Sequence, residues 1–114
     1  MKFSIYHAKP TFDANGRFSG TTSGFGQNQT TFPDDYEHVA DVNVDNLDDA
    51  FALTQNYDRP WTDKEGVTAR RELPRSTSVG DVIVRHDPEH GAMHALVLPW
   101  GFQTFLGNTV PPAR

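Results

Sequence analysis

The stretch that decides the fold is Arg75–Phe102, RSTSVGDVIVRHDPEHGAMHALVLPWGF. Its polar start, residues 75–81, ends in a Gly-Asp pair and is followed by the apolar run 82–84. A turn-rich break at 87–91 leads into a second apolar run, 95–98. Two apolar runs separated by turn residues are typical of a β-hairpin. The stretch therefore predicts a C-terminal hairpin.

Further strands are expected before this hairpin. Residues 2–8 and 40–44 alternate between apolar and polar side chains, which is typical of half-buried strands. Asn15-Gly16, between Phe12 and Phe18, is a strong hairpin signal because both turn residues tolerate the positive φ of a type I′ turn. Residues 67–72 are expected to form another short strand.

One principal helix is predicted over about residues 45–56. Asp45 can cap its start, and Asp48 and Asp49 suit the positive end of the helix dipole. Asn56 can adopt the left-handed conformation of a C-terminal cap, and Pro60 disfavours a longer helix. Strands around one helix predict an α+β fold with a mainly antiparallel sheet.

The chain length and composition predict a single domain over residues 1–107. A chain of 114 residues is long enough for one core and too short for two. Residues 20–31 contain one large apolar side chain, Phe25, and are expected to be a mobile surface loop. Residues 108–114 are expected to be a frayed tail.

The charge and residue usage exclude several classes of function. Ten basic and 15 acidic residues give a net charge of −5, which argues against the basic surface that nucleic-acid binding requires. The absence of cysteine excludes disulfides, zinc thiolate sites and cysteine nucleophiles. No apolar run approaches the ~20 residues of a membrane span, and no signal peptide is recognisable at the start. We expect a cytoplasmic protein with no cofactor and no membrane partner.

Several segments together resemble YodL-like domains, a group of small domains of bacterial mobile elements and phages with actinobacterial relatives. The resemblance covers roughly residues 38–105, and its most specific part is the run Arg-Ser-x-Ser-Val-Gly-Asp-Val at 75–82. The other matching residues are Leu47-Asp48-Asp49-Ala50-Phe51, Thr54-Gln55-Asn56, Arg59-Pro60-Trp61, Ile83 and Gly101-Phe102. The resemblance implies an accessory protein of a mobile element that can interfere with host processes or host defence. It implies no catalytic residues.

Three histidines suggest a metal site as one alternative. His86, His90 and His94 lie four residues apart, but the proline and glycine between them are incompatible with a helix. On a hairpin, His86 and His94 would be near cross-strand neighbours with His90 at the tip. We expect exposed turn histidines; the alternative is a metal ion held with Asp87 or Glu89.

Residues 76–78, Ser-Thr-Ser, could supply a hydroxyl nucleophile with Asp81 and a histidine. The sequence lacks the Gly-x-Ser-x-Gly nucleophile elbow, however. Serine and threonine before a strand commonly satisfy local backbone groups, and Gly80-Asp81 is a turn pair. We therefore expect a non-enzymatic protein in which these residues form a turn.

The leading hypothesis is a module that binds a host protein. Acidic residues before the helix could dock a basic partner. Trp61 and Trp100 each follow a proline, and each could either pack in the core or contribute to an interface. The alternative is a small nucleic-acid-binding domain that uses the one basic cluster, Arg70, Arg71 and Arg75. The candidate contact residues for a partner are Phe25, Asp34, Asp35, Glu37, Trp61, Arg70, Arg71, Arg75 and His90.

Overall fold

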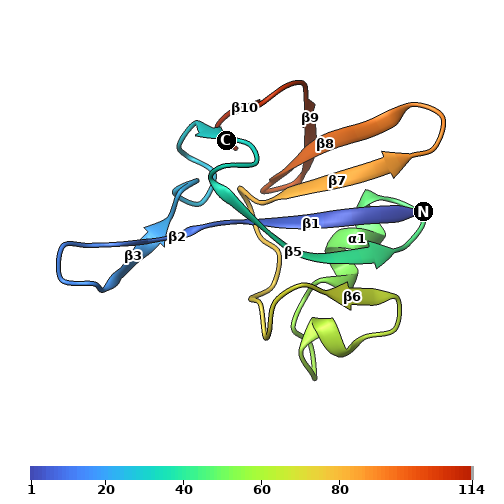
Figure 1. Cartoon of the computed structure of the whole chain (residues 1–114), viewed down its shortest axis with the longest axis horizontal. Helices are drawn as coiled ribbons and strands as arrows, with labels where there is room; N and C mark the ends of the chain where they lie inside the picture. The colour runs from blue at the N-terminus through green and yellow to red at the C-terminus, as the bar shows by residue number, and fades with distance from the viewer. Residues whose placement is uncertain (114) are drawn as a thin grey trace.

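A six-stranded antiparallel sheet forms the centre of the molecule in the computed structural model, which describes residues 1–113 (Figure 1). The strands lie in the order β6 (Val67–Ala69), β5 (Tyr36–Asn43), β1 (Lys2–Ala8), β7 (Val82–Asp87), β8 (Gly91–Leu98) and β9 (Gly101–Phe105). Two small two-stranded sheets pair β2 (Pro10–Phe12) with β3 (Phe18–Thr21), and β4 (Thr30–Thr31) with β10 (Thr109–Val110). The prediction of a small α+β domain with a mostly antiparallel sheet and one helix is confirmed.

The sheet has a core on each face. Alternate residues of a strand point to opposite faces, so Phe3 and Ile5 of β1 lie on one face and Tyr6 and Ala8 on the other. The first core contains α1 (Leu47–Leu53) and the 3₁₀ turn η1 (Trp61–Asp63), through Ala50 and Trp61. The second core is closed by residues from the β4 and β10 region: Phe32, Tyr36, Val110 and Ala113. β1 is thus covered on both faces rather than half-buried.

Helix α1 is shorter than the predicted span 45–56. Its N-cap is Asn46, whose side-chain oxygen accepts a hydrogen bond from Asp49 N at 2.8 Å, so Asp45 is not the cap. Thr54 ends the helix, and its hydroxyl donates to the carbonyl of Ala50 at 2.9 Å. Asn56 lies beyond the helix and accepts a hydrogen bond from the backbone N–H of Trp61 at 2.9 Å. The helix is therefore capped by Asn46 in place of Asp45, and Asn56 holds the start of η1 in place of the helix end.

The β2–β3 hairpin projects away from the main sheet as an arm (Figure 1). Gly16 has a positive φ of 78°, but Asn15 does not, so the turn is not the predicted type I′. Asp13 sets the turn instead, because its carboxylate accepts from the backbone N–H groups of Asn15 at 2.8 Å and Arg17 at 3.0 Å. We call residues 10–21 the arm.

The loop at 20–31 and the C-terminal segment, which were predicted to be mobile and frayed, contact each other. β10 pairs with β4, and Val110 is buried in the second core. Ala113 N donates to the carbonyl of Gly26, which ties the two segments together. Gly26 has a φ of 87°, and a Cβ there would lie 2.5 Å from the Ala113 Cβ. Arg114, the last residue of the predicted tail, lies outside the described residues.

Among residues 1–113, no helix combines the length and apolar character needed to cross a bilayer.

Candidate functional site

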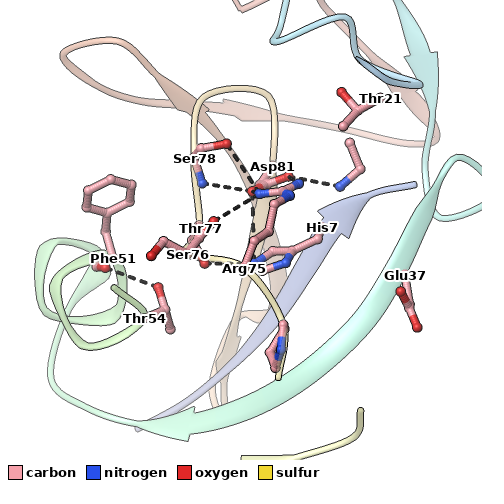
Figure 2. Close-up of polar contacts among 12 residues, drawn as sticks. His7, Thr21, Glu37, Phe51, Thr54, Arg75, Ser76, Thr77, Ser78 and Asp81 are labelled. Atoms are coloured by element: carbon pink, nitrogen blue, oxygen red, sulfur yellow. Dashed lines mark hydrogen bonds and ion pairs between the residues drawn. The ribbon is translucent and has the colours of Figure 1, made fainter. Parts of the chain in front are cut away.

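The loop that carries the Arg-Ser-x-Ser-Val-Gly-Asp run closes around a buried carboxylate (Figure 2). Asp81 is 1% exposed and accepts four hydrogen bonds. Its Oδ1 accepts from Ala8 N at 2.9 Å and Arg75 Nη2 at 2.7 Å. Its Oδ2 accepts from Ser78 N at 2.8 Å and Arg75 Nη1 at 2.6 Å. The bidentate guanidinium and two backbone donors supply the partners that a buried carboxylate needs.

The same loop is joined to the end of helix α1. Thr77 N donates to the carbonyl of Thr54 at 3.0 Å, and Gln55 Nε2 donates to the carbonyl of Thr77 at 2.9 Å. The indole N–H of Trp61 donates to the carbonyl of Arg75 at 2.8 Å. The motif therefore connects β1, the helix end and η1, which gives a physical reason for its residue types that involves no ligand.

His7 is the titratable group at the centre of this arrangement. Its Nε2 lies 2.9 Å from Thr77 Oγ1 and 4.0 Å from Asp81 Oδ2 (Figure 2). Burial lowers the pKa of His7 to about 4, and the nearby Asp81 carboxylate offsets this only in part. His7 is thus neutral at pH 7, and its approach to Asp81 is not an ion pair.

The geometry does not match that of an activated hydroxyl nucleophile. Thr77 is 1% exposed, so its hydroxyl does not reach a substrate. Asp81 approaches the same histidine nitrogen that contacts Thr77, whereas an orienting carboxylate binds the opposite ring nitrogen. The arrangement can hold the loop in place, and the hydroxyl beside the histidine is buried within it.

A second polar network lies on the other face of the sheet. Ser4 Oγ lies 2.6 Å from Asp41 Oδ1 and 2.7 Å from His86 Nε2. Because the serine hydroxyl has a single proton, which it donates to the carboxylate, His86 Nε2 must carry a proton and donate to Ser4. Burial acts to raise the pKa of Asp41, but hydrogen bonds from Ser4 and His38 outweigh it and hold the pKa below its ordinary value. Sequence reasoning missed this network, because its members come from β1, β5 and β7.

The three histidines of the β7–β8 region are separated. His86 binds Ser4, and burial lowers the pKa of its ring. His94 packs between Phe32 and Phe105, with ring centroids 4.7 and 5.2 Å away. His90 alone is an exposed turn residue, 3.3 Å from the Asp87 carboxylate. Within residues 1–113, no three His, Cys, Asp or Glu side chains are placed to hold a metal ion together.

The arginines do not form one free basic surface. Arg75 is bound to Asp81, and Arg71 Nη1 lies 2.7 Å from Glu37 Oε1. Arg70 Nη1 lies 3.8 Å from Asp41 Oδ2, in the second network. Each guanidinium therefore has a carboxylate beside it, which reduces the positive potential available to a phosphate.

The structure separates the other candidate contact residues. Trp61 is fully buried, so its interpretation as a contact residue is wrong. Phe25 and Asp34 are exposed, while Asp35 is half-buried and accepts a hydrogen bond from Thr31 N at 2.7 Å. Trp100, which also follows a proline, is the exposed tryptophan.

The arm carries aromatic side chains that the sequence analysis treated only as flanks of a turn. Phe12 is 61% exposed and Phe18 is 63% exposed. Their ring centroids are 6.4 Å apart at an interplanar angle of 74°, an edge-to-face pair. The strong turn signal at residues 15–16, with a phenylalanine on each side, could have identified this feature.

No protein-family model, curated protein sequence or solved structure matches this chain. The fold and the site define a small α+β domain with an exposed aromatic arm and with a loop at 75–81 that the buried Asp81 carboxylate holds in place; we call these contacts of Asp81 the staple. The resemblance to YodL-like domains stays a prediction.

Proposed function

We propose that this chain is a non-enzymatic accessory protein of a phage or other mobile element that binds a host protein. Binding in the cytoplasm would inhibit a host process or a defence system, in keeping with the resemblance of residues 38–105. Its contact surface is centred on the arm rather than on the motif at 75–81, because the side chains of that motif are engaged within the fold.

The observation that carries this proposal is the exposure of Phe12 and Phe18 on a projecting hairpin. Two phenylalanines in solvent leave apolar area uncovered. Burying that area in an interface would stabilise the complex by about 25 cal/mol per Å². Aromatic side chains are enriched at the centres of protein interfaces. Their edge-to-face contact also holds the two rings as one unit.

The surroundings of the arm add polar contact groups. Lys9 N donates to the carbonyl of Asp35 at 3.0 Å, and the Thr22 hydroxyl donates to the same carbonyl at 2.6 Å. The base of the arm is therefore fixed to the start of the acidic segment 34–49. A partner that covers the arm would meet carboxylates at its rim, which favours a partner with basic residues there.

Affinity capture from a bacterial lysate, with and without nuclease and read by mass spectrometry, tests the proposal. We expect one stoichiometric protein that survives nuclease treatment. Phe12→Ser and Phe18→Ser should each lose it, whereas Tyr57→Ser should retain it, since Tyr57 is a comparably exposed aromatic residue (68%) outside the arm. Recovery of nucleic acid alone would favour the alternative in which Arg70, Arg71 and Arg75 bind nucleic acid.

A further inference from the structure

The two edges of the main sheet are protected very differently. β6, at one edge, has three residues and is followed by Arg70 and Arg71, each beside a carboxylate. β9, at the other edge, has five residues and no proline, and residues 91–113 contain no Asp, Glu, Lys or Arg. Natural proteins protect exposed edges with charges, prolines, bulges or short strands. β9 has none of these, and its only sheet partner among residues 1–113 is β8.

Two of the most exposed large apolar residues of the chain flank this unprotected edge. Trp100 precedes β9 and is 81% exposed, and Leu106 follows it and is 96% exposed. A groove of about 660 Å³ opens beside Leu106. Its lining includes Met93, His94 and Phe105.

We propose that β9 pairs antiparallel with β9 of a second copy of this chain, about a two-fold axis at Gln103. In this register residue i faces residue 206 − i, so Trp100 lies opposite Leu106 of the other copy. Phe105 lies opposite Gly101, which has no side chain and where a Cβ would have met no atom within 4 Å, so nothing obstructs the close approach of the two strands there. The Trp100 indole is brought to the partner's groove beside Leu106, and the symmetry repeats each contact.

The interface is small. It consists of a five-residue strand, its backbone hydrogen bonds and two apolar contacts on each side, which places it among interfaces below about 1,200 Å². Such interfaces form weak, reversible complexes, so the dimer depends on protein concentration. The arm lies outside this register, and dimerisation is therefore independent of the partner binding proposed above.

A single introduced cysteine tests the register, because the chain has none of its own. Residues directly opposite in an antiparallel pair have Cα atoms about 4.5–5.5 Å apart, within the range of about 4.4–6.8 Å that a disulfide requires. Gln103→Cys should therefore form a covalent dimer under mild oxidation. The matched control is Thr68→Cys, at the centre of the protected edge strand β6, which should stay monomeric.

Sedimentation equilibrium supplies the second measurement. We expect the wild type to shift from monomer to dimer with rising concentration, and Gln103→Lys to remain monomeric because two like charges would meet at the axis. Trp100→Ser should weaken dimerisation at least about tenfold. Cross-linking of Gln103→Cys no faster than Thr68→Cys would overturn the proposal, as would a wild type that stays monomeric up to about 1 mM.

Discussion

Asp81→Asn should destabilise the fold strongly although it changes the side chain by one atom. An asparagine amide group in place of Oδ2 would point a donor at two donors, Arg75 Nη1 and Ser78 N. Two hydrogen bonds to a charged group would be lost, each contributing about 1.5–3 kcal/mol. Because the Arg75 side chain is 40% exposed, solvent screens its hydrogen bond to Asp81. We therefore expect a combined loss of about 3 kcal/mol for the two bonds, at the lower end of the range.

Urea unfolding followed by circular dichroism measures this loss. In thermal unfolding, the same loss of about 3 kcal/mol would lower Tm by about 12 °C, at about 4 °C per kcal/mol. Asp34→Asn is the matched control, since it removes the same charge from an exposed carboxylate and should change stability by less than about 0.5 kcal/mol. If Asp81→Asn cost less than about 1 kcal/mol with an unchanged m-value, the carboxylate would not be the staple of the motif.

Two further predictions concern the neighbours of Asp81. The pKa of His7 lies near 4 in the folded chain and near 6.5 in the unfolded chain, so the unfolded state binds more protons between these values. The fold should lose about 3 kcal/mol as pH falls from 7 to 4, and unfolding curves of His7→Gln should lack that part of the pH dependence; an equally steep loss in the variant would contradict the assignment. Gly80→Ala should cost more than about 2 kcal/mol, because Gly80 has a φ of 92° and its new Cβ would lie 2.6 Å from Ser23 Oγ and 2.8 Å from Gly26 N. Gly16→Ala is its comparison, with similar φ and open space around it, and a Gly80→Ala variant no less stable than Gly16→Ala would refute the close packing.

Local patterns in the sequence predicted where strands and the helix occur better than they predicted where each element begins and ends. The alternation at 2–8 and 40–44 depends on neighbouring residues; β1 is found over the first range, whereas β5 overlaps the second and already begins at Tyr36. The helix start was misplaced by one residue because Asp45 and Asn46 are both good caps, and the choice between them depends on which side chain reaches Asp49 N. Local rules give the type of an element more reliably than its ends.

The site was harder to predict because its contacts join distant parts of the chain. Gly80-Asp81 was recognised as a turn pair, but the donors that fix Asp81 include Ala8 N, 73 residues away. Trp61 and Trp100 both follow a proline, and only tertiary packing buries the first and exposes the second. Phe12 and Phe18 were recognised as flanks of a hairpin, whereas their exposure follows from the projection of the arm away from both cores.

The most direct test of the account is the affinity of arm variants for the captured partner, measured by calorimetry at fixed salt. Phe12→Ser and Phe18→Ser should each weaken binding by about 10- to 100-fold, as expected for aromatic residues at the centre of an interface. Their free energies of unfolding should fall by no more than about 1.5 kcal/mol, because each variant removes the edge-to-face contact and little other buried area. Tyr57→Ser should bind within about twofold of the wild type. If the arm variants bound as tightly as Tyr57→Ser, the arm would not be the contact surface.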